Sequence, residues 1–401
     1  MDGVPCLRVQ SGHAQEMKRS LQSRGFLDRS LCLIKDSDGS VLLPILHSSL
    51  VHLDVHSPAN SSVGEIVWRK CPVPSKKARG RTGGKLEKIL EEFLESHGEV
   101  LTEELRRDLP RSFQQHGDLV ILGDSCFTSP VWKKMEGQLW SAVTSALGVK
   151  RLAKMGRISK NGFRTPVVTM LLGEHSWVSH VDNGIRYEFD VTKCMFSAGN
   201  ISEKLRVAAL DCTGETVVDL YAGIGYFTLP YLVHAKASHV HACEWNPDAV
   251  EALQKNLQAN KVSERCTIHQ GDNRQLQLSD VADRVNLGLI PSSEDGWPVA
   301  CMLLKKNTGG VLHIHHNVTS PLQTADDVIQ RDSGKKADKE AWQAWADHAS
   351  NRIASLLKDL TGAAWSTSVQ HIERVKSYAP HVHHVVLDLE CRPSCAVKTI
   401  K

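Results

Sequence analysis

The chain has 401 residues, a formal net charge of +3, and 41% hydrophobic and 23% charged residues, which are ordinary values for a soluble globular protein. A single hydrophobic core rarely grows beyond about 250–300 residues, so this length predicts about two or three domains. No apolar run approaches the ~18 residues of a membrane helix, and residues 1–20 lack the apolar segment of a secretory signal. We therefore predict a soluble, intracellular protein.

Eleven cysteines are scattered singly along the chain, and none belongs to a CxxC pair. An odd number without repeated spacing does not fit a disulfide framework and gives little support to a zinc site. We expect reduced thiols, a cytoplasmic location and no bound metal. Two histidine groups also suggest a metal, but alternation along a strand would put His313 and His315 on one face and His316 on the other. The two groups are His313, His315 and His316, and His381, His383 and His384.

The N-terminal part, residues 1–74, is predicted to be a small α+β domain. A helix is expected over 14–24, and residues 31–45 are interpreted as two strands joined at an Asp-Gly pair, which is typical of hairpin turns. Residues 75–85 are polar and basic and are interpreted as a flexible linker that leads into a helix. The charge of this linker suits either RNA contact or ordinary solvation, and both alternatives stay open.

Residues 86–149 are predicted to be a helical and α+β part, with an apolar strand within 108–122 and a helix over 132–147. A β-rich domain is expected at 150–195, where candidate strands with an Asn-Gly turn follow a basic run. The run at 151–164 has five positive charges and no acid, so we expect it to contact RNA phosphates. Its basic residues are Arg151, Lys154, Arg157, Lys160 and Arg164.

The C-terminal part, residues 196–395, is predicted to be an α/β domain. Apolar runs separated by helical stretches indicate a parallel, doubly wound sheet, and residues 368–391 are expected to end it as an antiparallel pair. The polar stretch 319–339 is interpreted as a mobile loop. An apolar stripe over 342–356 then predicts an amphipathic helix that packs on the core. The runs expected to form strands are 216–220, 238–243, 266–269, 284–290 and 310–314.

One segment, DLYAGIGYFTLP at 219–230, has the pattern of a strand that breaks at glycines and enters a helix, which indicates a nucleotide-binding loop. The dinucleotide fingerprint requires a small residue where this chain has Thr228, so a better template is an acid followed by GxG: Asp219, Gly223 and Gly225. This form suits S-adenosylmethionine, which has no pyrophosphate to bind. Asp219 and Gly223 are thus candidate cofactor-binding residues. By location Asp219 is also a candidate proton acceptor, although structural hydrogen bonding beneath the loop is the favoured interpretation.

Polar residues also end the next two predicted strands. Glu244 ends the second, where an acid can accept hydrogen bonds from both ribose hydroxyls of a nucleoside. Asp272 and Asn273 end the third, where a carboxylate and an amide can bond the edge of an adenine ring. The alternative is that these two residues cap a helix, since both residue types are common at such turns.

A helix is also expected just before the glycine loop. Asn200 and Glu203 fit a capping box at its start. Lys204 lies one turn into this helix, where a cation opposes the helix dipole. Such a lysine is either solvated or in contact with a ligand carboxylate, and the methionine moiety of S-adenosylmethionine carries one.

Seven stretches carry a resemblance to a known family: DLPRSFQQHGDL, HVDNGIRYEFDVTKCMFSAGNISEKLRVA, VDLYAGIGYFTLP, HACEWNP, GDNRQL, GLIPSSEDGWP and VKSYAPHVHHVVLDLEC. Together they resemble the tRNA wybutosine-synthesizing protein 2 family. That family transfers the 3-amino-3-carboxypropyl group of S-adenosylmethionine to carbon 7 of 4-demethylwyosine at position 37 of tRNA(Phe), and releases methylthioadenosine.

This resemblance covers most of the chain and implies a Rossmann-like class I S-adenosylmethionine-dependent methyltransferase fold, preceded by smaller α+β domains that help to hold tRNA. It implies S-adenosylmethionine as a consumed co-substrate and the anticodon loop of tRNA(Phe) as the partner. Contact with other enzymes of wybutosine biosynthesis is left open. The cofactor contacts that it implies are Ser197, Lys204, Glu244, Asp272 and Asn273.

A sister family, the tRNA guanosine-37 ring-nitrogen methyltransferases, shares this architecture and is the main alternative. Its members usually carry an arginine shortly after a Phe-Ser pair, whereas this chain has FSAGN at 196–200. The sister family's NLPxxA-type segment is replaced here by GLIPSSEDGWP at 288–298. Both departures favour transfer of the aminocarboxypropyl group over methyl transfer. A non-catalytic tRNA-binding accessory protein and an NAD-dependent oxidoreductase are the remaining alternatives.

Overall fold

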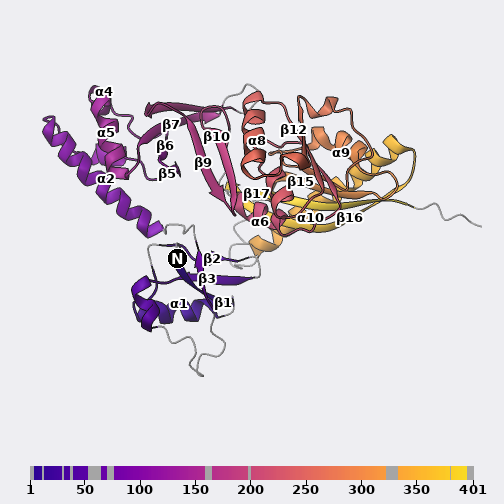
Figure 1. Ribbon diagram of the computed structural model, residues 1–401, viewed down its shortest axis with the longest axis horizontal. Coiled ribbons are helices and arrows are strands. Elements are labelled where there is room, and N and C mark those ends of the chain that lie inside the picture. The colour runs from indigo at the N-terminus through magenta and orange to yellow at the C-terminus, as the bar shows by residue number, and fades with distance from the viewer. Residues whose placement is uncertain are drawn as a thin grey trace, which may run out of the picture. The chain divides into compact units, whose positions relative to one another are not determined.

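The computed structural model describes residues 4–10, 13–28, 31–36, 39–52, 65–69, 76–158, 165–196, 200–321, 333–379 and 381–394. The chain divides into two compact units, which are described separately (Figure 1). The first contains Met1–Gly156 and Thr169–Glu174, and the second contains Arg157–Val168 and His175–Lys401.

The first unit begins with a four-stranded sheet in the order β2-β3-β1-β4. β2 and β3 pair antiparallel, so the predicted hairpin is confirmed; Gly39 in its turn has a φ of +80°, and Asp38 lies outside the described residues. Leu7 and Leu43 from the strands and Leu21 from the helix are buried together in one core. The elements are β1 (Val4–Gln10), α1 (Ala14–Ser23), β2 (Ile34–Lys35), β3 (Ser40–Pro44), η1 (His47–His52) and β4 (Ile66–Arg69).

The rest of this unit combines helices with a sheet in the order β5-β6-β7-β8. Leu86, Leu90 and Leu94 recur at helical spacing and are all buried. Their helix begins at Lys76, so residues 76–85 form its first turns and the expectation of a linker there is wrong. The elements are α2 (Lys76–Ser96), α3 (Glu103–Arg107), β5 (Phe113–His116), β6 (Leu119–Gly123), α4 (Pro130–Lys134), α5 (Glu136–Leu147), β7 (Arg151–Ile158) and β8 (Pro166–Leu172).

Two side chains of the basic run at 151–164 are engaged within the fold. Arg151 is buried and forms an ion pair with Asp118, and the Lys154 ammonium donates to the Cys126 carbonyl at 2.7 Å. Two of its five charges are therefore engaged within the fold and are not available to RNA phosphates. Residues 159–164 lie outside the described residues.

The second unit contains a seven-stranded sheet in the order β13-β12-β11-β14-β15-β17-β16. The strands β13, β12, β11, β14 and β15 run parallel, and β17 is antiparallel to both β15 and β16. The five predicted strands and the antiparallel pair at the end are thereby confirmed. The strands are β11 (Thr216–Asp219), β12 (His239–Glu244), β13 (Cys266–Gln270), β14 (Arg284–Leu287), β15 (Gly310–Thr319), β16 (Trp365–Ala379) and β17 (Val382–Pro393).

Helices cover both faces of this sheet. Alternate strand residues such as Val285 and Leu287 of β14 share a buried core with α9 (Trp297–Leu303) and α10 (Ser333–Thr361), whereas α7 (Thr228–Val233) and α8 (Pro247–Ala259) lie on the opposite face (Figure 1). The stripe on α10 packs on the core as expected, with Ala349 and Ile353 fully buried. β15 extends to Thr319 and α10 begins at Ser333, so most of the predicted loop 319–339, residues 322–332, lies outside the described residues.

A hairpin of β9 (Trp177–Asp182) and β10 (Ile185–Asp190) also belongs to the second unit. Its backbone is bonded to α8, because the Glu188 N–H donates to Asn256 Oδ1 at 2.6 Å and the Arg186 N–H to Asn260 Oδ1 at 3.0 Å (Figure 1). The stretch 150–195, expected to be one β-rich domain, is thus divided: β7 joins the sheet of the first unit, and this hairpin packs in the second. Among the described residues, no helix is both long and apolar enough to cross a membrane.

Candidate functional site

Asp219 holds the loop between β11 and α7 from beneath. It is fully buried at the end of its strand and accepts hydrogen bonds from Thr228 Oγ1 at 2.8 Å and Asn286 Nδ2 at 2.9 Å. Burial raises the pKa of this carboxyl group above its ordinary value. These contacts support the interpretation of Asp219 as a structural residue. Thr228 is the residue at which the dinucleotide pattern fails, and its hydroxyl group has a structural role here because it donates to Asp219.

The two glycines let this loop bend tightly over the end of β11. Gly223 and Gly225 have φ values of +56° and +100°, which side chains rarely allow. A Cβ atom on Gly223 would lie 2.8 Å from the Tyr226 ring, and one on Gly225 would lie 3.0 Å from Leu253 of α8. The loop backbone is therefore packed too closely for other residues, as the GxG spacing predicts.

Glu244 lies at the end of β12, directly beside the glycine loop. The Gly223 N–H donates to Glu244 Oε2 at 2.8 Å, and the Asn246 N–H donates to Oε1 at 2.8 Å. Burial raises the pKa of this carboxyl group. Each carboxylate oxygen can accept a further hydrogen bond, so the side chain is placed to accept from two adjacent hydroxyls. Trp245 directly follows Glu244 and has 45% of its surface exposed. The sequence prediction did not include it, although an aromatic residue directly after the strand-end acid could have indicated it.

Asp272 and Asn273 follow β13, and both already have partners within the chain. Asp272 accepts from the Arg274 backbone N–H at 2.9 Å, and its ion pair with the Arg274 side chain lowers its pKa. It therefore caps the short turn η5 (Asn273–Gln275), in agreement with the capping alternative. Asn273 Nδ2 donates to the Leu220 carbonyl at 2.8 Å, which ties the end of β13 to the end of β11.

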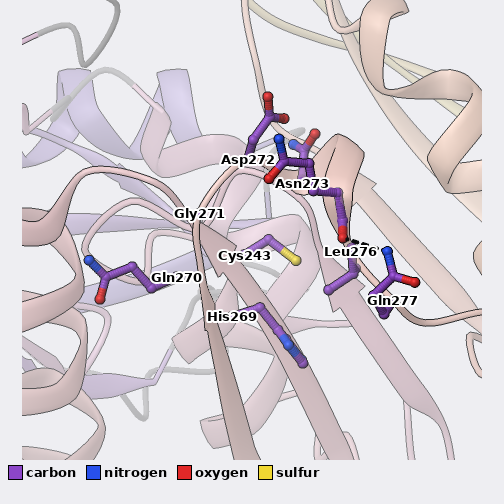
Figure 2. Close-up of a pocket in the computed structure, with 9 residues that line it drawn as sticks. Cys243, His269, Gln270, Gly271, Asp272, Asn273, Leu276 and Gln277 are labelled. Atoms are coloured by element: carbon purple, nitrogen blue, oxygen red, sulfur yellow. Dashed lines mark hydrogen bonds between the residues drawn. The ribbon is translucent and has the colours of Figure 1, made fainter.

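A pocket of about 280 Å³ opens beside η5 (Figure 2). Figure 2 shows Cys243 and His269 on the same side of the sheet, with Gln270 pointing away from them. Asp272 and Asn273 form one end of this pocket. The sequence offered adenine contacts and capping as alternatives for these two residues, and a residue that caps η5 can also line the pocket. The lining residues are Cys243, His269, Gln270, Gly271, Asp272, Asn273, Gln275, Leu276 and Gln277.

Lys204, on α6 (Ile201–Ala208), is buried and forms an ion pair with Asp182 at the end of β9. The solvated alternative for this lysine is therefore wrong. Its ammonium nitrogen lies 5.1 Å from the ring centroids of both Tyr187 and Phe196. The Phe196 ring in turn lies 6.0 Å from the ring of Tyr226, the residue after Gly225, so the lysine belongs to an aromatic cluster that reaches the glycine loop.

The start of α6 differs from the predicted capping box. Asn200 makes no side-chain cap hydrogen bond, and the Glu203 carboxylate instead accepts from Arg206 at 2.8 Å. Arg206 also donates to Asp388 of β17, so Glu203 is drawn into an ion-pair network with the sheet. Ser197, the remaining cofactor contact implied by the resemblance, lies outside the described residues.

The histidines of β15 and β17 have roles in packing. His313 Nδ1 contacts Asp388 at 2.7 Å, and His315 Nδ1 contacts His384 Nε2 at 3.0 Å; all three histidines are buried. Burial lowers the pKa of His384 to about 4, and it lowers the pKa of His315 as well. His316 lies on the other side and stacks on Trp345. Within the described ranges, no group of three or more His, Cys, Asp or Glu side chains is arranged to hold a metal ion.

The strand order, the glycine loop after β11 and the acid after β12 together define the class of the second unit. It is a class I methyltransferase-like α/β domain, with a site for a nucleoside at the carboxyl ends of its parallel strands. Comparison with protein-family models agrees. The TRM5/TYW2 methyltransferase domain matches residues 178–341, and two TYW2 N-terminal domain models match residues 6–78 and 90–176.

Curated relatives identify the family within this class. The tRNA wybutosine-synthesizing protein 2 homolog of Danio rerio is 55% identical over 98% of this chain and 100% of its own length. The homolog of Homo sapiens is 50% identical over 96% of this chain and 93% of its own length. The chain belongs to the tRNA wybutosine-synthesizing protein 2 family.

Solved structures share the fold. The crystal structure of TYW2 of P. horikoshii in complex with MeSAdo has a TM-score of 0.55 and 27% identity, over 77% of this chain and 99% of that one. Trm5b from Pyrococcus abyssi has a TM-score of 0.56 and 23% identity, over 97% of this chain and 99% of that one. These likenesses confirm the expected fold class, in which smaller N-terminal parts precede the methyltransferase-like domain.

Proposed function

We propose that this chain transfers the 3-amino-3-carboxypropyl group of S-adenosylmethionine to carbon 7 of 4-demethylwyosine at position 37 of tRNA(Phe). This is a step of wybutosine biosynthesis and releases methylthioadenosine. The observation that carries the proposal is the 55% identity to a wybutosine-synthesizing protein over 98% of this chain. The MeSAdo complex of the P. horikoshii relative supports the identity of the co-substrate.

The residues present fit such a co-substrate. Glu244 is partly buried and accepts from the Gly223 N–H, so its carboxylate lies directly against the glycine loop, where the resemblance places the ribose. Glu244 and Gly223 are assigned to the ribose, Asp272 and Asn273 to the adenine, and Lys204 with Ser197 to the methionine end. Asp219 acts on the co-substrate only through the loop that it supports.

Catalysis in this site is mainly placement. When bound, S-adenosylmethionine supplies an electrophilic γ-carbon. The leaving group is methylthioadenosine, a neutral thioether, so no side chain has to protonate it. What the chain must do is fix the pose that turns this carbon, and not the methyl group, toward the base. A fixed in-line geometry can supply several kcal/mol of the rate enhancement. Lys204, held by Asp182 and two aromatic rings, is a rigid point for that purpose.

The tRNA partner is the anticodon loop, whose purines can be turned out into a pocket for chemistry. The basic stretches 76–85 and 151–164 are the proposed phosphate contacts, apart from Arg151 and Lys154, which bond within the fold. We also propose a cytoplasmic location, where tRNA is modified in a reducing environment. Contact with other enzymes of the pathway belongs to this proposal as well.

Two labelled co-substrates test the reaction directly. The chain is incubated with tRNA(Phe) that carries 4-demethylwyosine, and the label is placed either on the carboxylate or on the methyl group of S-adenosylmethionine. We expect carboxylate label in the tRNA and methyl label in methylthioadenosine. Entry of methyl label into the tRNA would show a ring-nitrogen methyltransferase instead. Tight tRNA binding with no transfer of either label would favour an accessory protein.

Comparing ligands with and without the methionine carboxylate distinguishes a contact between Lys204 and that carboxylate from a role of Lys204 in packing. We expect Lys204→Ala to weaken binding of S-adenosylmethionine by about 10-fold or more, since a hydrogen bond to a charged group contributes about 1.5–3 kcal/mol. Binding of methylthioadenosine, which lacks the carboxylate, should change much less. Calorimetric titration with both ligands measures the difference.

Asp182→Asn is the matched variant for this test, because it removes the partner in the ion pair and keeps the ammonium group. It should retain most of the preference for S-adenosylmethionine over methylthioadenosine. If Lys204→Ala weakens both ligands equally, the lysine supports the aromatic cluster and does not contact the carboxylate.

A further inference from the structure

Tyr221, the second residue after Asp219, reaches from the glycine loop to a neighbouring turn of the second unit. Its ring is partly buried and packs against the core that β14 and α9 share. The side chain of Asn273, at the start of η5, is hydrogen-bonded to its hydroxyl group. Burial raises the pKa of this phenol above its ordinary value, so the hydroxyl keeps its proton at neutral pH. One side chain therefore connects the glycine loop with the turn that follows β13.

Asn273 is held at two points by the segment that enters the glycine loop. Its Nδ2 atom donates to the Leu220 carbonyl at 2.8 Å, and its side chain also bonds the Tyr221 hydroxyl. A side-chain amide has two donor hydrogens and one acceptor oxygen, so two fixed contacts decide which of its groups remain for a ligand. Asn273 also lines the pocket beside η5 and is assigned to the adenine ring (Figure 2). The orientation of this amide in the pocket is thus set from behind, by the loop.

Gly296 is a second close neighbour of the Tyr221 hydroxyl. It ends η6 (Glu294–Gly296), in the segment that follows β14, and it is buried. A Cβ atom on Gly296 would lie 2.5 Å from Tyr221 Oη, and 3.4 Å from both Tyr221 Cζ and Leu287 Cδ2. The backbone does not require glycine here, because Gly296 has a φ of −88°, which any residue can adopt. The hydroxyl group is thus what excludes a side chain at this position.

The lack of a side chain at Gly296 protects the bond between Tyr221 and Asn273. A methyl group at Gly296 could be admitted only if the Tyr221 ring moved. That ring packs against the core and its hydroxyl is bonded to Asn273, so the movement would pull the hydroxyl away from the amide. The substitution Tyr221→Phe would keep the packing of the ring, and would lose both the hydrogen bond and the close approach to Gly296.

We propose that Tyr221 is a positioning residue for the co-substrate: its hydroxyl group, admitted by Gly296, orients the Asn273 amide toward the amino edge of the adenine ring. The inference deepens the proposed function and rests on it for the identity of the nucleoside. An amide with a fixed orientation distinguishes donors from acceptors on a ligand, whereas an amide that turns does not. Tyr221 therefore contributes to the choice of a 6-amino purine over a 6-oxo purine.

The test is calorimetric titration of the full chain with methylthioadenosine and with methylthioinosine, in which an oxo group replaces the 6-amino group. The unchanged chain should bind methylthioadenosine more tightly. Tyr221→Phe should weaken methylthioadenosine binding roughly 2- to 13-fold, because a hydrogen bond contributes about 0.5–1.5 kcal/mol net. Its effect on methylthioinosine should be much smaller. A role of Tyr221 in packing alone would affect the two ligands equally, since they differ only at that edge of the base.

Gly296→Ala tests the same contact from the other side. Alone, it should weaken methylthioadenosine binding to an extent similar to Tyr221→Phe, because the new methyl group displaces the hydroxyl. When Tyr221→Phe is already present, it should cost less than about twofold, since only contacts of 3.4 Å remain and the two changes act through one contact. Gly137→Ala in α5 is the matched control, because a Cβ atom there would meet nothing within 4 Å. It should leave both affinities unchanged.

Urea unfolding of each variant shows that the chain remains folded. Equal weakening of both ligands by Tyr221→Phe would overturn the inference, and so would unchanged binding of methylthioadenosine by this variant. Equal affinity of the unchanged chain for the two ligands, or additive losses from Gly296→Ala and Tyr221→Phe, would overturn it as well. Because binding is measured without tRNA and without turnover, a failure of the proposed reaction is detected separately, by the labelled co-substrates.

Discussion

Replacing Arg206 with methionine is expected to lower the free energy of unfolding by about 3–5 kcal/mol at neutral pH. Its guanidinium donates to Glu203 at 2.8 Å and to Asp388 at 3.0 Å, and Glu203 is fully buried. Methionine fills similar space, so the main change is the loss of positive charge beside two buried carboxylates. Urea unfolding followed by circular dichroism measures the effect.

The pH dependence of this loss identifies its cause. Burial would raise the pKa of Asp388, but hydrogen bonds from His313 and Arg206 outweigh that effect and hold it below the ordinary 3.8. A lowered pKa in the folded state stabilises the protein above that ordinary value, and the stabilisation is lost as the pH falls toward the folded-state pKa. Without Arg206 the two carboxyl groups should take up protons more easily. The deficit of Arg206→Met should therefore be largest at neutral pH and shrink toward pH 4.

Two further variants complete this comparison. Arg392→Met removes an exposed ion pair with Glu390 and should cost at most about 1 kcal/mol. Adding Glu203→Gln and Asp388→Asn to Arg206→Met removes the uncompensated charges and should recover part of the lost stability. A deficit of equal size at pH 4 and pH 7 would mean that packing, and not charge, holds α6 on the sheet.

The strands of the sheet could be predicted from the sequence because each one is marked by residues next to one another in the chain. The parallel strands of the second unit follow apolar runs bounded by polar turns, and they differ from the expected bounds by only a few residues at their ends. The assignment of 150–195 to one domain did not describe the fold, because β9 and β10 are bonded to the side chains of Asn256 on α8 and of Asn260, its C-cap residue, far along the chain. The residues of the hairpin and its sequence neighbours give no indication of those hydrogen bonds.

In the site, too, features set by neighbouring residues were predicted, and contacts with residues far along the chain were not. The places of Asp219, Gly223 and Glu244 follow from spacing along successive strands, and the structure brings them together around one loop. The partners of α6 do not follow from spacing. Glu203 fits a capping box by local pattern, but its partner Arg206 is held by Asp388, 182 residues further along the chain.

Glu244→Gln is expected to weaken binding of methylthioadenosine by roughly 10- to 150-fold, which corresponds to about 1.5–3 kcal/mol for hydrogen bonds to a charged acceptor. The carboxylate would accept from ribose hydroxyls, whereas an amide has only one acceptor oxygen and must also face the N–H groups of Gly223 and Asn246. Burial raises the pKa of Glu244 above the ordinary 4.5, so affinity in the unchanged chain should fall with decreasing pH before that value is reached. Calorimetric titration over pH measures both effects, and the variant should lose this pH dependence.

The 2′-deoxy analogue of methylthioadenosine separates contact with the ribose from damage to the loop. The unchanged chain should bind this analogue less tightly than methylthioadenosine, because one hydroxyl contact is missing. Glu244→Gln should bind the two ligands with nearly equal affinity, since the acceptor that distinguishes them has been replaced. If the variant still discriminates between the ligands as strongly as the unchanged chain, Glu244 does not accept from the 2′-hydroxyl. Its role would then be to hold Gly223 in place, and the affinity lost on substitution would reflect the shape of the glycine loop.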